Sequence, residues 1–572
     1  MSCTAVKRVI REARDFRLTS AALVLFMLIA VSASSAQATF TSLFEFDGTN
    51  GSQPSHVYLA QGTDGQLYGT ASVNGGNGLG TAWKIMTDGA FTQLYSFCSQ
   101  PTCSDGGISY AGLTLAPNGN FYGVTECDNG CTSAPLDGTI FEITPTGTYT
   151  VLHTFTGTDG SASYNNMTLG SDGNLYGTTS SGGTGYGNVF KISPAGKFTS
   201  IYSFTGGADG YYPVSRLFQG SNGNFYGTTS YGGNYSFAGG GGGTVFEITP
   251  AGKLTTLYSF CSSSSCPDGA TPDGGVVQVS NGTIYGTTTY GGISNTWGTL
   301  YKLVGRKLTT LYDFCSLANC ADGNYPDGGL IQATDGNFYG TTDGGGPSAG
   351  TVYEFIPPNT VKTLYSFCQQ TQCADGALPY YGGLLQATDG NFYGTTLEGG
   401  ISGALGTVYR VSTGLGPFVQ SISTSAKVGA SVTILGTNLT GATALTFGTT
   451  AATIKTNSGT AITTTVPAGA TTALISVTTP TGTLNSNTTF KVLPQITKFS
   501  PTSGAVGTSV TITGVSLTQT SSVTFGGVKA TSFTVNSDTE VTVTVPTGAK
   551  TGKIVITTPG GTATSAATFT VT

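Results

Sequence analysis

The sequence is poor in charge and in histidine, and each shortage excludes a class of function. Only 9% of the 572 residues are charged, against about 25% in an ordinary globular protein. The net charge of −6 leaves no basic face for a nucleic acid. The two histidines, His56 and His153, are accompanied by no nucleophile motif, so a Ser-His-Asp triad is disfavoured.

Long apolar runs are also missing after the N-terminus. Residues 1–38 read as a signal peptide, with five basic residues, an apolar core over residues 21–31 and a small-residue cleavage site at Ala36-Gln37-Ala38. The core is shorter than the roughly 20 residues that cross a bilayer. We therefore expect cleavage before Thr39 and no membrane span afterwards. The exported chain, secreted or at the cell surface, would keep 17 basic and 26 acidic residues, a net charge of −9.

Glycine, by contrast, is abundant, and much of it belongs to a repeat. A Tyr-Gly motif, most often within Asn-Phe-Tyr-Gly-Thr-Thr, recurs seven times. Its tyrosines, called the repeat tyrosines below, are Tyr68, Tyr122, Tyr176, Tyr226, Tyr285, Tyr339 and Tyr393. Their intervals of 54, 54, 50, 59, 54 and 54 residues are typical of a repeat architecture.

Each repeat unit contains four apolar runs of four to seven residues, separated by Asp-Gly, Asn-Gly or Gly-Gly turns. Such runs predict four antiparallel strands. The third and fourth runs are apolar on both faces, so each sheet needs a neighbour on both sides. Four-stranded sheets repeated radially make a β-propeller. We therefore predict an all-β protein with a seven-bladed β-propeller over residues 39–413.

The order of the runs predicts how the ring closes. A fourth-strand pattern over residues 40–46 precedes the first unit, whereas the last unit ends at Val411 without one. We expect residues 40–46 to pair with residues 406–411 and complete the last blade. Closure would also hide the free edges that invite aggregation.

A second self-similarity begins after the linker around Pro417. Residues 428–436 match residues 506–514 at an offset of 78, within two segments of about 80 residues that hold short alternating strands. This pattern predicts two immunoglobulin-like β-sandwiches in tandem, at residues 417–493 and 494–572.

Both regions resemble known families. The motifs Tyr-Gly-Thr-Thr, Gly-Thr-Val-Phe-Glu-Ile and Leu-Tyr-Ser-Phe at fixed offsets resemble the bacterial GloVer-type tandem repeats, which occur in secreted proteins. Phe499-Ser500-Pro501 and the run Val523-Thr524-Phe525-Gly526-Gly527 are similar to IPT/TIG domains. Neither resemblance implies a set of catalytic residues.

Ten cysteines follow the signal segment, and they form close pairs in sequence. The pairs are Cys98–Cys103, Cys127–Cys131, Cys261–Cys266, Cys315–Cys320 and Cys368–Cys373. In an exported protein this spacing predicts local disulfide bonds. Metal binding by thiolates is the alternative, but structural zinc prefers four converging ligands.

Aspartate recurs in the connections from each fourth strand to the next first strand. After the first unit these residues are Asp105, Asp159, Asp209, Asp268, Asp322 and Asp375. We interpret them as turn residues that bind their own backbone. Calcium binding, an oxygen-ligand chemistry, is the alternative, and no other cofactor is expected. These connections and those from second to third strands emerge on one face, called the loop face below.

Aromatic residues outside the repeat pattern also fall in or beside the loops of this face. They are Tyr211, Tyr231, Tyr235, Tyr290, Trp297 and Tyr381. Because aromatic rings stack on sugars, the sequence favours a non-catalytic binding or adhesion protein that recognises a polysaccharide or a surface protein. An extracellular carbohydrate-active enzyme, hydrolase or lyase, and a structural surface component stay open as alternatives. The acidic residues look evenly distributed among the units, which favours binding over catalysis.

Overall fold

The computed structural model describes residues 38–572 except residues 128–136, 236–240, 294–295, 347–348 and 402–404. The expected signal segment, residues 1–38, therefore lies outside the described part but for Ala38. Nowhere in that described part is a helix long and apolar enough to cross a membrane.

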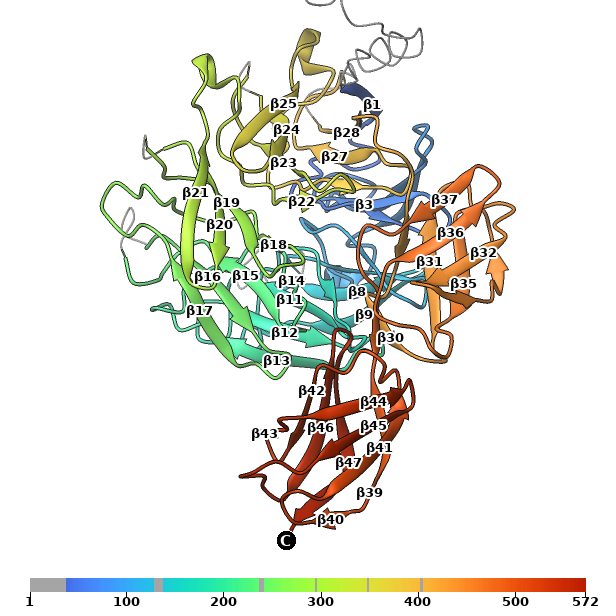
Figure 1. Ribbon diagram of the computed structural model, residues 1–572. Helices are drawn as coiled ribbons and strands as arrows, with labels where there is room; N and C mark the ends of the chain where they lie inside the picture. The colour runs from blue at the N-terminus through green and yellow to red at the C-terminus, as the bar shows by residue number, and fades with distance from the viewer. Residues whose placement is uncertain (1–37, 128–136, 236–240, 294–295, 347–348, 402–404) are drawn as a thin grey trace, which may run out of the picture. The chain divides into compact units, whose positions relative to one another are not determined.

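Residues 39–412 form seven four-stranded antiparallel sheets, arranged like propeller blades (Figure 1). The first strands are β2 (Ala60–Gln61), β6 (Thr114–Leu115), β10 (Thr168–Leu169), β14 (Phe218–Gln219), β18 (Val276–Gln278), β22 (Ile331–Gln332) and β26 (Leu385–Gln386). The second strands, which carry the repeat tyrosines, are β3 (Leu67–Ala71), β7 (Phe121–Val124), β11 (Leu175–Thr179), β15 (Phe225–Thr229), β19 (Ile284–Thr288), β23 (Phe338–Thr342) and β27 (Phe392–Thr396).

The third strands are largely buried, and the fourth strands lie at the sheet edges. The third strands are β4 (Thr81–Ile85), β8 (Thr139–Ile143), β12 (Asn188–Ile192), β16 (Thr244–Ile248), β20 (Thr299–Val304), β24 (Thr351–Ile356) and β28 (Thr407–Ser412). The fourth strands are β5 (Phe91–Ser96), β9 (Tyr149–Thr154), β13 (Phe198–Ser203), β17 (Leu254–Ser259), β21 (Lys307–Asp313), β25 (Thr360–Ser366) and, from the N-terminus, β1 (Thr39–Glu45).

Neighbouring sheets stack through their apolar faces. The ring of Tyr176 lies 4.0 Å from that of Phe225 in the next sheet, and both belong to one buried cluster that also holds Phe246. The glycine after each repeat tyrosine makes room for an aromatic ring of the third strand. A Cβ at Gly177 would lie 2.5 Å from Phe190, as expected for a site where a side chain cannot fit.

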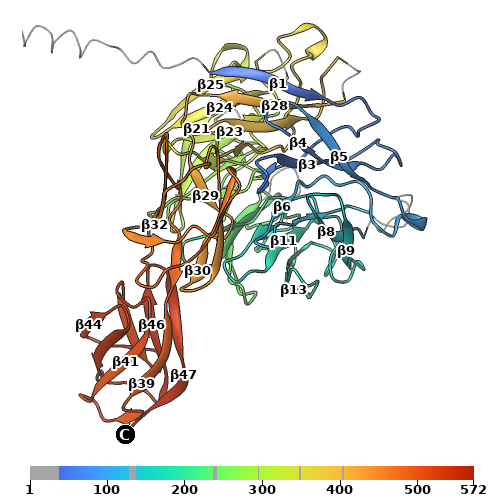
Figure 2. The same cartoon turned by 90° about the vertical axis from the view of Figure 1, so that its right-hand side faces the viewer.

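The N-terminal strand closes the ring as the sequence predicts. β1 pairs antiparallel with β28, with Phe40 opposite Val411 and Glu45 opposite Thr407 (Figure 2). One buried cluster then joins the last sheet to the first, and it includes Phe46, Trp83 and Val408. The seventh sheet is therefore built from the two ends of the repeat region.

The centre of the ring is filled by an axial ring, defined as the residues ten positions before each repeat tyrosine. They are Tyr58, Gly112, Asn166, Arg216, Gly275, Gly329 and Gly383. The Tyr58 hydroxyl accepts the N–H of Gly329 at 2.9 Å, and the Asn166 side chain donates to the carbonyl of Tyr58 at 2.9 Å. These bonds join sheets that are not neighbours, so three side chains meet on the axis while four glycines leave space.

The same packing explains why the first strands are short. The sequence predicts a strand over residues 383–387, whereas β26 comprises Leu385–Gln386. A Cβ at Gly383 would lie 1.7 Å from the ring of Tyr58. The chain before β26 therefore packs against an axial side chain and not in a ladder.

Two C-terminal β domains follow, and they share one strand order. The first domain has two four-stranded sheets and one strand pair. One sheet has the order β29 (Val419–Ser421), β31 (Ser431–Gly436), β35 (Ala461–Thr465) and β34 (Thr456–Asn457), and the other has the order β33 (Thr450–Ala452), β32 (Ala444–Phe447), β36 (Ile475–Thr479) and β37 (Gly482–Asn485). The pair is β30 (Ser425–Lys427) with β38 (Lys491–Leu493). In the second, the sheets are β39 (Gln495–Ser500), β41 (Ser509–Val515), β45 (Glu540–Thr544) and β44 (Phe533–Ser537), and β40 (Ser503–Gly504), β47 (Gly561–Val571), β46 (Gly552–Thr558), β42 (Ser522–Phe525) and β43 (Val528–Lys529). Each domain encloses its own apolar core.

Removing the side chain at the closure should destabilise the whole ring. Phe46 is 1% exposed, so we expect Phe46→Ala to lower the free energy of unfolding by about 3–5 kcal/mol. Met86, 45% exposed, provides a control whose replacement by Ala should cost less than about 0.5 kcal/mol. Denaturant unfolding of both variants measures the difference, and equal effects would contradict the closure.

The axial ring makes a second prediction, on the fit between Gly383 and Tyr58. Gly383→Ala places a methyl group against the Tyr58 ring, so we expect a loss of about 1–3 kcal/mol in unfolding free energy. The loss should vanish when Tyr58 is already Ala, because the added methyl group then has space. Gly416→Ala is the control, since nothing lies within 4 Å of a Cβ there. An undiminished loss in the double variant would show that Tyr58 is not the obstacle.

Candidate functional site

The aspartates of the loop face are tied to the fourth strands. Each carboxylate lies within hydrogen-bonding distance of an aromatic side chain on the preceding strand: Tyr95–Asp105 at 2.6 Å, His153–Asp159 at 3.0 Å, Tyr202–Asp209 at 2.9 Å, Tyr258–Asp268 at 2.8 Å, Tyr312–Asp322 at 2.8 Å and Tyr365–Asp375 at 2.7 Å. Burial acts to raise the pKa of Asp105, but hydrogen bonds from Tyr95 and Ser99 outweigh it and the pKa is lowered. These contacts give the aspartates a structural task, and calcium binding stays a prediction.

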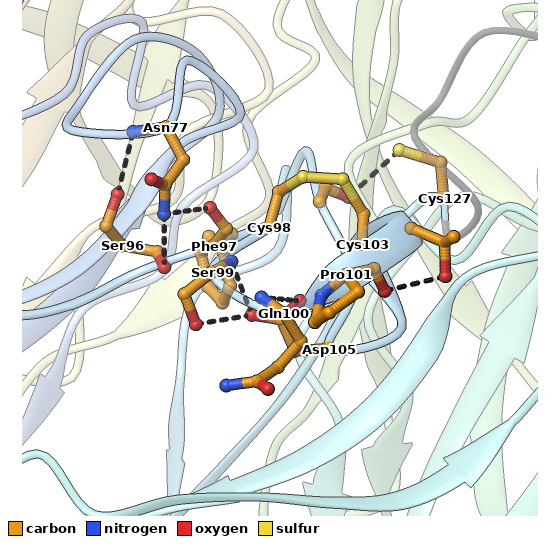
Figure 3. Close-up of a disulfide and its surroundings, with 12 residues drawn as sticks. Asn77, Ser96, Phe97, Cys98, Ser99, Gln100, Pro101, Cys103, Asp105 and Cys127 are labelled. Carbon is orange, nitrogen blue, oxygen red and sulfur yellow. Dashed lines mark hydrogen bonds between the residues drawn. A yellow bond between two sulfur atoms is a disulfide. The ribbon is translucent and has the colours of Figure 1, made fainter.

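The disulfide bonds lie beside these aspartates. Figure 3 shows the Cys98–Cys103 bond next to Asp105, whose carboxylate accepts the backbone N–H groups of Ser99 and Gln100. The corresponding bonds of the fifth, sixth and seventh connections are Cys261–Cys266, Cys315–Cys320 and Cys368–Cys373. The Cys127–Cys131 pair cannot be followed, because Cys131 lies outside the described residues. The bonded connections give the loop face a rigid rim.

The predicted ligand-binding aromatics fall into separate groups. Tyr211 and Tyr231 lie with their ring centroids 5.4 Å apart. Tyr290 and Trp297 each lie 5.4 Å from the ring of Tyr325, and Tyr235 is 46% exposed. Tyr381 lies apart from these groups, near the axis, among residues that the sequence analysis did not single out.

Those residues form an inner ring, defined as the positions twelve before each repeat tyrosine. They are His56, Tyr110, Tyr164, Val214, Asp273, Asp327 and Tyr381. His56 stacks on Tyr381 at 4.5 Å with planes 6° apart, and the Tyr381 hydroxyl donates to Asp273 at 3.1 Å. Residues of the first, fifth and seventh repeat units therefore meet in the inner ring. Residues of different units meet in the same way in the axial ring, which lies two positions further along each unit.

Aromatic rings follow the inner ring through four units as an aromatic row, which then continues to Tyr212, Tyr231 and Tyr211. Successive ring centroids are Tyr381–His56 at 4.5 Å, His56–Tyr110 at 5.6 Å, Tyr110–Tyr164 at 5.7 Å, Tyr164–Tyr212 at 6.4 Å, Tyr212–Tyr231 at 5.9 Å and Tyr231–Tyr211 at 5.4 Å. The row connects the predicted residues Tyr381, Tyr231 and Tyr211. Sequence reasoning missed Tyr110, Tyr164 and Tyr212. The signal for Tyr110 and Tyr164 is their common place twelve positions before the repeat tyrosine.

Four carboxyl groups accompany these rings. Asp273 accepts hydrogen bonds from Ser230, Thr289 and Tyr381, yet burial raises its pKa to about 6. Glu126 accepts the Tyr164 hydroxyl at 2.6 Å, and burial raises its pKa as well. Both groups therefore hold a proton more readily than exposed acids do.

Asp327 and Asp343 complete the set and influence each other. Asp327 is 3% exposed, and its Oδ1 has no hydrogen-bond partner within the described part of the chain. Burial, followed by the charges of Asp343 and Asp273, raises the pKa of Asp327 well above its ordinary value. Burial, followed by the charge of Glu398, raises the pKa of Asp343 to about 6.

These carboxyl groups correct the expectation that acidic residues are evenly distributed. The fifth and sixth units carry Pro-Asp-Gly-Gly at residues 272–275 and 326–329, where other units carry no acid. The additional aspartates of these two units are therefore visible in the sequence, but what they could do depends on their position within the repeat. Only the ring brings Asp273, Asp327, Asp343 and Glu126 to one centre.

The arrangement offers stacking surfaces beside hydrogen-bonding carboxyl groups. His56 adds no positive charge, because burial lowers its pKa to about 3. Across the described residues no three His, Cys, Asp or Glu side chains lie close enough to hold a metal ion. The site is suited to an organic ligand with apolar faces and polar edges, a combination that sugars have.

Comparisons with solved structures give distant likenesses. A surface glycan-binding protein from Prevotella bryantii is 19% identical over 26% of this chain and 38% of that one, with a TM-score of 0.21. An SGBP-B from a xyloglucan utilization locus of Bacteroides uniformis is 24% identical over 27% and 48%, with a TM-score of 0.15. A fungal alcohol oxidase in complex with copper is 12% identical over 79% and 98%, with a TM-score of 0.43. The chain thus spans less than half the length of the two glycan-binding proteins.

Family models match most of the chain, although no curated protein sequence does. The IPT/TIG domain model matches residues 494–571. The Gloeobacter/Verrucomicrobia repeat model matches residues 29–184, 131–332 and 315–498, which together span all seven sheets. The chain therefore belongs to the Gloeobacter/Verrucomicrobia repeat family.

Proposed function

We propose that this chain is an exported binding protein that recognises a glycan through the loop face of a seven-bladed β-propeller. In this proposal residues 1–38 direct export, residues 39–413 form the propeller, and residues 417–493 and 494–572 are two IPT/TIG domains. The shared strand order of the two C-terminal domains supports the last assignment. Local disulfide bonds support export, because they persist in oxidising compartments.

The aromatic row is the observation that carries the proposal. Seven rings follow one another with neighbouring centroids 4.5–6.4 Å apart, four of them in the inner ring, and Tyr231 near the other end is 36% exposed. Sugar rings stack on aromatic faces, and successive rings can hold successive residues of one polysaccharide. Disulfide bonds constrain the connections that carry Tyr110 and Tyr381, which lowers the ordering entropy that these two residues lose when a ligand binds.

Hydrolysis of a glycan is the second candidate, and the pair Asp327 and Asp343 favours it. Their raised pKa values are what a general acid needs near neutral pH, and glycosidases use two carboxyl groups. The binding proposal is preferred because the aromatic row extends well beyond the pair.

A glycan array with the mature chain tests both functions. We expect binding to one class of polysaccharide, and Tyr164→Ala should weaken it about tenfold, equivalent to about 1.4 kcal/mol. Tyr164→Phe keeps the ring and should bind nearly normally. Val304→Ala, at a 57% exposed site at the end of the third strand β20, is the surface control.

The array hits should then be incubated with the protein and inspected for shortened products. Intact ligands support a binding protein. Cleavage that stops in Asp343→Asn would establish the hydrolase instead, and an array without hits would refute glycan recognition.

A further inference from the structure

The inner ring has an unbalanced charge. Glu126, Asp273, Asp327 and Asp343 all lie at or beside it, and among the described residues none of them forms an ion pair. Asp273 and Glu126 accept hydrogen bonds from neighbouring hydroxyl groups. Asp327 is 97% buried, and its Oδ1 has no hydrogen-bond partner in the part of the chain that the structure describes. A buried carboxylate in this situation is costly unless something positive reaches it.

Among the described residues, no positively charged side chain forms an ion pair with Asp327. Its electrostatic neighbours include two further carboxyl groups, Asp273 and Asp343, the backbone N–H groups of Tyr381 and of Asp327 itself, and the hydroxyl groups of Tyr58, Tyr290, Tyr353, Tyr380 and Tyr381. The guanidinium of Arg216 lies 5.7 Å over the ring of Tyr58 and is absent from that set. His56, stacked on Tyr381, is neutral because burial depresses its pKa.

The remaining features match an organic cation better than a metal ion. No three acidic, histidine or cysteine side chains converge closely enough in the described part to ligate a metal. Aromatic faces line the same centre, and such faces attract ammonium groups when they are shielded from water. Tyr381 combines both features, since its ring stacks on His56 while its hydroxyl binds Asp273.

We propose that the inner ring selects glycans that carry a positive charge, namely amino sugars with a free or alkylated amine. This inference rests on the glycan-binding function proposed above and specifies its ligand. The ammonium group sits beside Asp327 and Asp273, and the following sugars lie along the aromatic row through Tyr110 and Tyr164.

The carboxyl groups set the direction of the pH dependence. Burial raises the pKa of Asp273 and of Asp343 to about 6, so these two become charged as the pH rises through about 6. The pKa of Asp327 is raised as well, and only the charged forms attract an ammonium group. For a ligand whose charge is permanent, affinity should therefore increase from pH 5 to pH 8. Binding should also release protons near pH 6, because the cation favours the ionised carboxyl groups.

Calorimetric titration of the mature chain tests the inference with three glucosamine oligosaccharides. The probes carry free amines, trimethylated amines or N-acetyl groups on otherwise identical chains. We expect the trimethylated probe to bind at least tenfold more tightly than the N-acetylated one, and more tightly at pH 8 than at pH 5. Asp327→Asn should reduce its affinity about tenfold and flatten the pH dependence, while Val304→Ala changes neither.

Two checks keep the outcomes distinct. Thermal unfolding verifies that Asp327→Asn folds, and Asp273→Asn provides a second variant with the same expected loss. Equal or tighter binding of the N-acetylated probe would overturn the charge selection and leave glycan binding intact. Unchanged affinity of both folded Asp variants for the trimethylated probe would overturn it as well. Failure of every glycan, charged or neutral, would instead remove the binding function.

Discussion

Stacking of sheets that are apolar on both faces is the constraint on which the rest of this structure depends. A four-stranded sheet with Tyr176 on one side and Phe190 packed toward the other cannot face water on either side. Each sheet therefore needs two neighbours, and a row of seven would still leave two apolar faces uncovered. Closure removes those faces, and it requires the N-terminal strand β1 to join β28. The last repeat unit lacks its fourth strand, and an additional fourth strand, β1, precedes the first unit. The two ends of the repeat region therefore meet this requirement together.

Closure has a second consequence, because it creates an axis where seven equivalent positions meet. Seven identical large side chains cannot occupy that centre, so the seven positions of the axial ring carry residues of different sizes. Tyr58, Asn166 and Arg216 extend inward while four glycines give way. The fold is therefore symmetric in its backbone and asymmetric at its centre. An asymmetric centre beside a rigid rim can distinguish one ligand from another, which a perfectly repeated surface cannot do.

The inner ring shows the same division between scaffold and site. Residues repeated in every unit, such as the loop aspartates, already have hydrogen-bond partners within the repeat, as in the pair Tyr312–Asp322. Residues that differ between units are less fully paired, and Asp327 leaves its Oδ1 without a hydrogen-bond partner among the described residues. In a repeat protein, departure from the consensus therefore indicates function better than the consensus does. The four carboxyl groups and the aromatic row are departures of this kind.

The sequence alone determined the seven sheets, their four strands and the role of the N-terminal strand. It could do so because strand patterns are local in sequence. A repeat of about 54 residues also allows the strands assigned in one unit to be checked against the other units. His153 stands where most fourth strands carry a tyrosine, and the structure packs it on Phe198. The tertiary structure decided which loop residues meet. Asp273 and Tyr381 lie 108 residues apart in the chain, and no local pattern gives the direction in which a side chain points once seven units close into a ring. Their contact, and the burial that raises the pKa of Asp273, exist only because the two ends of the repeat region are joined.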